Sequence, residues 1–106
     1  MNLNEWANEI HANAVNHGWW ENERPLPEVL MLIVSELSEA LEEARAGRPM
    51  VWHANNGKPE GIAVEVIDAL IRILDWCGKE SLDVEALVEE KHEYNMSRPY
   101  KHGKIF

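Results

Sequence analysis

Residues 32–41 read LIVSELSEAL, and residues 65–70 read EVIDAL. Each stretch carries two acidic side chains three positions apart among apolar ones: Glu36 with Glu39, and Glu65 with Asp68. Residues at this spacing lie on one face of an α-helix, with Cβ atoms ~5–6 Å apart. Both stretches are therefore predicted to be helical, and each acidic pair is predicted to converge on one point.

The rest of the chain continues this helical pattern, and no stretch reads convincingly as a strand. Apolar spacing predicts four helices, at about residues 3–17, 25–46, 61–77 and 83–96. Pro25 and Pro27 suit a first helical turn, and Asp83 suits an N-cap. Gly18 and Gly78 are expected to end the first and third helices.

The connection between the second and third helices, residues 47–60, is rich in Gly, Pro and Asn. A connection this long between packed helices is usually functional or mobile. Residues 97–106 read as an irregular tail. We expect one all-α domain over residues 1–106, with the fold of a four-helix bundle.

Composition excludes several classes of protein. Asp and Glu number 19 against 10 Lys and Arg, a formal net charge of −9, which disfavours a nucleic-acid polymer as partner. Lone Cys77 excludes an internal disulfide and favours a reducing cytoplasm. The longest apolar run, Val29–Val34, is too short to span a membrane, and the first residues lack the pattern of a signal peptide.

On ideal helices the acidic residues lie beside an apolar stripe rather than opposite it. In the second helix this stripe comprises Leu26, Leu30, Ile33, Val34, Leu37, Leu41 and Ala44. In the third helix it comprises Ile62, Val66, Ala69, Leu70 and Ile73. Arg72 and Asp75 continue the acidic edge of the third helix, which is otherwise apolar nearly all round and is expected to be buried.

Four carboxylates that face one another across two antiparallel helices repel one another and lose hydration. A divalent cation relieves both effects, and oxygen-only ligands favour Mg²⁺, with Mn²⁺ or Ca²⁺ as alternatives. Magnesium usually shares its coordination shell with substrate phosphates, which indicates phosphate chemistry. An isolated Glu-x-x-Glu is more often a solvated helix face, so the pattern alone leaves both interpretations open.

The motifs resemble a known family, the MazG-like, all-α nucleoside triphosphate pyrophosphohydrolases. The residues that resemble its E-x-x-E and E-x-x-D signature are Glu36, Glu39, Glu65 and Asp68. Those that resemble its K-x-x-x-N-x-x-R ending are Lys91, Asn95 and Arg98. Two positions depart from the pattern: Ser35 replaces a frequent further Glu, and Ala46 replaces an aromatic of relatives that prefer deoxycytidine triphosphate.

The resemblance implies hydrolysis of a (deoxy)nucleoside triphosphate to the monophosphate and pyrophosphate, as house-cleaning of the nucleotide pool. It implies that the two acidic pairs hold Mg²⁺ and that Glu36 or Glu39 orients or deprotonates a water. Lys91 would assist at the phosphates. The expected substrate-binding residues are His11, Trp20, Trp52, Arg72, Lys91, Asn95 and Arg98. For Arg72, a salt bridge with Asp68 one turn away is an equal alternative.

Two other classes remain as alternatives. A di-iron carboxylate bundle needs two Glu-x-x-His motifs, and only the one from Glu89 to His92 is present. A non-enzymatic dimerisation or adaptor module would have merely solvated acidic faces. Because the third helix needs more apolar cover than one chain of this size offers, we expect a homodimer or a dimer of dimers, as the resemblance also implies.

Overall fold

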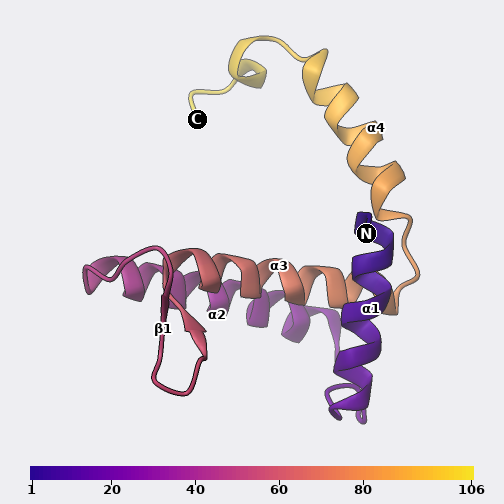
Figure 1. Cartoon of the computed structure of the whole chain (residues 1–106). Coiled ribbons are helices and arrows are strands. Elements are labelled where there is room, and N and C mark those ends of the chain that lie inside the picture. Colours follow the sequence, from indigo (N-terminus) through magenta and orange to yellow (C-terminus); the bar gives the residue numbers. More distant parts are fainter.

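Figure 1 shows a computed structural model of the chain, which describes residues 1–106. Its elements are α1 Leu3–Asn16, α2 Leu26–Arg45, β1 Trp52–His53, β2 Pro59–Glu60, α3 Ile62–Lys79, α4 Val84–Met96 and a 3₁₀ turn, η1, at Tyr100–Gly103. The predicted all-α class and its four helices are confirmed. The expectation of no strand is wrong, because β1 and β2 form a two-stranded hairpin. Strands of two residues are too short to show an alternating pattern in the sequence.

Local hydrogen bonds explain where the helices begin. The Asn2 side chain accepts from the Glu5 backbone N–H while the Glu5 carboxylate accepts from the Asn2 N–H, a capping box at the start of α1. Pro25 immediately precedes α2. Asp83 caps α4, as predicted, by accepting from the Ala86 backbone N–H.

Helices α2 and α3 lie antiparallel and side by side, and α1 crosses the C-terminal half of α3 (Figure 1). A small core of Ala7, Leu74 and Cys77 lies at this crossing. The expectation that Gly78 ends α3 is wrong, since the helix continues to Lys79. A Cβ at Gly78 would lie 2.5 Å from the Ala7 backbone oxygen, so glycine is needed here for the close approach of α1 and not for termination.

The apolar stripe predicted for α2 does not form a core within one chain. Leu37 and Leu41 remain 48% and 58% exposed, whereas Val29, Glu36 and Ala40 are buried. Helix α2 therefore turns Glu36 toward α3, and Leu37 and Leu41 outward. The predicted burial of α3 also fails within one chain, because five of its apolar residues stay at least 40% exposed: Val66, Ile67, Leu70, Ile71 and Ile73. No helix is both long and apolar enough to cross a membrane.

Helix α4 projects away from α2, and it meets the rest of the chain at α1 and at the C-terminal end of α3 (Figure 1). The Asn4 side chain fixes its start by donating to Asp83 at 2.9 Å and accepting from the Val84 N–H at 2.7 Å. No residue of α4 is buried. The radius of gyration is 16.4 Å, against about 13 Å for a compact chain of this length. A single chain therefore does not close the predicted four-helix bundle.

Candidate metal centre

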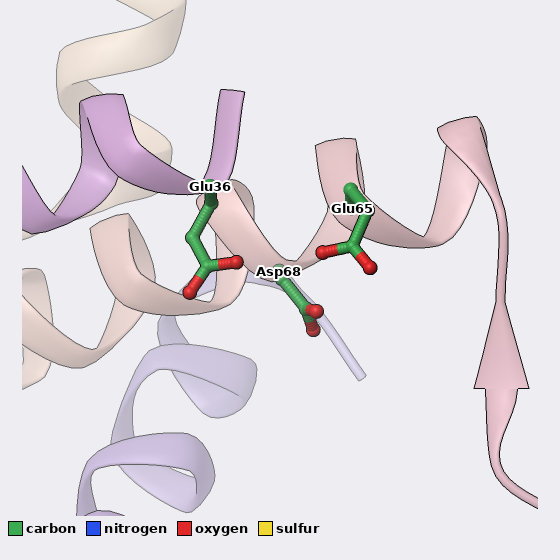
Figure 2. A group of neighbouring side chains, drawn as sticks. All are labelled: Glu36, Glu65 and Asp68. Atoms are coloured by element: carbon green, nitrogen blue, oxygen red, sulfur yellow. The ribbon is translucent and has the colours of Figure 1, made fainter. Parts of the chain in front are cut away.

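Three carboxylates converge between α2 and α3. Glu36 comes from α2, Glu65 and Asp68 come from α3, and one oxygen of each lies within 4.8 Å of the others. Figure 2 shows Glu36 facing the two side chains of α3, with Glu65 on the side where the preceding strand enters the helix. The convergence that the two motifs predict is therefore present for three of the four acidic residues.

Helix packing accounts for this convergence. Glu36 is only 9% exposed because it lies on the face of α2 that contacts α3. Glu65 lies in the first turn of α3, where its backbone N–H donates to the Gly61 carbonyl. Asp68 follows one turn later on the same face.

Crowding and burial shift the protonation of the α3 carboxyls. The pKa of Glu65 is raised to about 7, first because burial removes hydration and then because of a hydrogen bond with Glu39 and the charges of Asp68, Glu39 and Glu36. Burial also raises the pKa of Asp68, and the charge of Glu36 adds to the effect. A strongly raised carboxyl pKa in a cluster of acids is a feature of functional sites and of metal centres.

Glu39, the fourth predicted ligand, is exposed and lies at the edge of the cluster. Glu39 contributes to the raised pKa of Glu65 and so belongs to the surroundings of the three converging carboxylates.

The alternative expected for Arg72, a salt bridge with Asp68, is wrong. The Nε atom of Arg72 donates to Oε1 of Glu36 at 2.8 Å, across the helix interface, instead of pairing with Asp68 in its own helix. Its charge nevertheless lowers the pKa of Asp68. Arg72 therefore neutralises part of the cluster from inside and leaves the second oxygen of Glu36 available.

Asp75, predicted only to lie on the acidic edge of α3, contacts two of the expected substrate-binding residues. Its carboxylate accepts from Trp20 Nε1 at 3.0 Å and lies 2.8 Å from His11 Nδ1. The His11 and Trp20 rings meet edge-on at 5.7 Å between centroids. Because an ionised carboxylate only accepts, Nδ1 of His11 carries a proton and Nε2 is the nitrogen left for other partners.

A cavity of about 310 Å³ joins the carboxylate cluster to this end of α1. Its lining residues are Ile10, Asn13, Ala14, Trp19, Arg24, Glu36, Asp68, Ile71, Arg72 and Asp75. Trp19 lines this cavity and is 55% exposed. The guanidinium of Arg24 lies 5.4 Å from the centre of its ring. The same cavity is therefore lined by an aromatic side chain and by the carboxylates.

The other predicted substrate residues lie elsewhere in the single chain. Trp52 lies in the hairpin, where its Nε1 donates to Glu43 of α2 at 3.2 Å. Lys91 and Asn95 line a groove with the C-terminal end of α3, and the Oδ1 atom of Asn95 is buried without a hydrogen-bond partner. Lys91 and Arg98 both lie over the Tyr94 ring. One chain therefore does not bring the α4 residues to the carboxylate cluster.

The donor set suits a hard divalent cation. All the converging atoms are carboxylate oxygens, with no histidine or cysteine among them, and such ligands favour Mg²⁺ or Mn²⁺ over zinc or copper. A cation would also relieve the repulsion and lost hydration that raise the pKa of Glu65. No protein-family model, curated protein or solved structure matches the chain, so the functional assignment depends on this geometry and on the sequence motifs.

Proposed function

We propose that the protein is a Mg²⁺-dependent nucleoside triphosphate pyrophosphohydrolase, which releases the nucleoside monophosphate and pyrophosphate. The single observation that carries the proposal is the convergence of Glu36, Glu65 and Asp68 within 4.8 Å. The same residues form the motifs that resemble MazG-like enzymes. Bound Mg²⁺, or Mn²⁺ in its place, would offset charge on the phosphates and lower the pKa of a coordinated water.

The chain's own residues divide the remaining work. We assign metal binding to Glu36, Glu65 and Asp68, with Glu39 as a further ligand or as the group that accepts the water's proton. Glu39 suits this second role because it is exposed and makes no ion pair, whereas Glu36 is held by Arg72. The cavity wall with Trp19 and Arg24 offers an aromatic surface for a base.

The active form proposed is a homodimer or a dimer of dimers. The exposed apolar residues of α2 and α3 form a surface that a second chain would bury. Helix α4 projects from the body of its own chain. A second copy would let Lys91, Asn95 and Arg98 reach the phosphates at a neighbouring cluster. The proposed setting is the cytoplasm, where the substrate pool lies.

The adaptor module remains the competing class, since exposed apolar faces alone would suit it. It does not explain why three carboxylates gather in a partly buried position, where they destabilise one another. The two classes therefore differ in what the acidic residues do.

The test is pyrophosphate release from a panel of canonical and modified triphosphates, with Mg²⁺ or with EDTA. We expect release from at least one triphosphate with Mg²⁺ only, and a loss of about 100-fold or more in Glu65→Gln and Glu39→Gln. Glu80→Gln, an exposed acid paired only with Lys79, is the matched control and should keep full activity. Unchanged release by Glu39→Gln and Glu65→Gln would refute the proposal.

A further inference from the structure

The hairpin between α2 and α3 carries a cation close to the carboxylate cluster. Lys58 immediately precedes β2, and its side chain is 68% exposed. Its Nζ lies 3.1 Å from Oε1 of Glu60, which is its only ion-pair partner. The motifs that point to the metal centre do not include this lysine.

The backbone around Lys58 is fixed on both sides. Its carbonyl accepts from the Ala54 N–H at 2.9 Å, and its own N–H donates to Oδ1 of Asn56 at 3.0 Å. These bonds close the turn of the hairpin. Lys58 therefore projects from a defined position, although the hairpin lies in a connection of the kind that is often mobile.

The base of the hairpin is anchored to both neighbouring helices. Trp52 of β1 donates to Glu43 of α2, and the Met50 carbonyl accepts from the Ala63 N–H of α3 at 3.0 Å. A Cβ at Gly61 would lie 2.4 Å from the Met50 oxygen, so the two segments touch at a position only glycine allows. The hairpin is thus held against the end of α3 that carries Glu65.

The charges of Lys58 and of the cluster also influence each other's pKa. The pKa of Lys58 is raised, first by its hydrogen bond and charge interaction with Glu60 and further by the charges of Glu65 and Asp68. In the opposite direction, Lys58 lowers the pKa of Asp68. A flexible lysine with one surface partner can leave it for a stronger anion.

The order of groups along α3 defines which part of a nucleotide Lys58 would meet. Asp75, with His11 and Trp20, lies toward the C-terminal end, and Asp68 and Glu65 follow toward the N-terminal end. Asp75 and Glu65 are about 15 Å apart along the helix axis. The strand β2 enters α3 on the side of Glu65 (Figure 2), and Lys58 immediately precedes this strand in the chain.

We propose that Lys58 of the β1–β2 hairpin is a substrate-binding residue that holds the terminal phosphates, the pyrophosphate portion, of a triphosphate seated at the carboxylate cluster. This inference rests on the proposed function and extends it to a residue outside the motifs. Glu60 holds the lysine when no phosphate is bound and competes with the ligand for it.

The experiment measures binding of inorganic pyrophosphate and of a nucleoside monophosphate to the full chain by calorimetry with Mg²⁺. Lys58→Gln should weaken pyrophosphate binding about tenfold, as expected for loss of one charge-assisted contact, and leave monophosphate binding unchanged. Lys58→Arg should retain binding. Arg45→Gln, another exposed cation beside a glutamate, is the matched control and should bind both ligands like wild type.

A second pair of variants tests the role of Glu60. Glu60→Gln should strengthen pyrophosphate binding several-fold, and this gain should vanish in a Lys58→Gln background. A gain that persists there, or a Lys58→Gln loss confined to the monophosphate, would overturn the inference. If wild type binds Mg²⁺-pyrophosphate through Lys58 but hydrolyses no triphosphate, the proposed function fails and the site stands. If wild type hydrolyses triphosphates and Lys58→Gln binds pyrophosphate normally, the inference alone fails.

Discussion

The Nε atom of Arg72 lies 2.8 Å from Oε1 of Glu36, so a cation of α3 pairs with the buried carboxylate of α2. Their side chains are 33% and 12% exposed. The pair joins the two helices that carry the acidic motifs, and it sets the separation between Glu36 and the carboxylates of α3. In the proposed enzyme Arg72 is thus a positioning residue for the metal centre.

Replacing Arg72 by Gln should leave Glu36 buried beside Asp68 without its partner. We expect a loss of about 1–2 kcal/mol in the free energy of unfolding in EDTA, because both groups are partly solvated. Urea denaturation measures this loss. Arg45→Gln breaks an exposed pair with Glu42 and should change stability by less than about 0.5 kcal/mol; equal effects of the two variants would contradict the role of Arg72.

The raised pKa of Glu65, about 7 against an ordinary 4.5, predicts how metal-free stability depends on pH. The folded state binds this proton more tightly than the unfolded state, so the contribution is fully present below about 4.5 and is lost as pH rises through about 7. Glu65→Gln should therefore melt above wild type at pH 8 in EDTA and close to it at pH 5. Thermal melts at the two pH values check this, and a difference that does not vary with pH would contradict it.

Gly61 should be the most sensitive glycine of the hairpin. It has φ +119°, and a Cβ there would lie 2.4 Å from the Met50 oxygen, so Gly61→Ala should cost about 2–3 kcal/mol of stability. Gly57, at φ +86° with no atom within 4 Å of an added Cβ, is the matched control and should cost about 1 kcal/mol. Denaturant titration of both variants separates the steric effect from the conformational one.

Asp75 should matter for nucleotide binding although it contacts no proposed metal ligand. Asp75→Ala removes the acceptor of Trp20 and His11, and we expect about 2 kcal/mol of lost stability and a changed tryptophan emission. The KM for the triphosphate should rise more than kcat falls, because Asp75 acts through His11 and Trp20, which are expected to bind the substrate. A variant with wild-type KM would show that the Asp75 cluster is purely structural.

The exposed apolar face of α2 predicts self-association. Light scattering at micromolar concentration should give wild type the mass of a dimer or tetramer. Leu37→Glu, at a position 48% exposed in one chain, should shift the mass toward that of the 12.2 kDa monomer. Glu42→Lys, a charge change on the same helix at an exposed side chain, is the control. A monomeric wild type would contradict the proposed assembly.

The local features of the fold can be predicted from the sequence because they depend on neighbouring residues. Helix positions, the Asp83 cap and the partial burial of Glu36 all follow from spacing and capping rules. The continuation of α3 through Gly78 could not be predicted, because only the packed structure shows Ala7 against that glycine. The outward orientation of Leu37 could not be predicted either. Helical periodicity shows which residues share a face, but it does not show which element packs against that face.

For the site, the motifs indicated the acids but not their partners. Arg72 pairs with Glu36 across helices and not with Asp68 at helical spacing, and such long-range pairs leave no local signal. Asp75 was visible on the acidic edge of α3, yet its contacts with His11 and Trp20 connect segments more than 50 residues apart.

The central claim is that this cluster supports cleavage of a triphosphate between its α- and β-phosphates. Phosphorus NMR of a nucleoside triphosphate incubated with the protein and Mg²⁺ tests it most directly. We predict growing signals of monophosphate and pyrophosphate, which are absent with EDTA or with Glu65→Gln. Signals of diphosphate and orthophosphate, or no change for any triphosphate of the panel, would contradict the account.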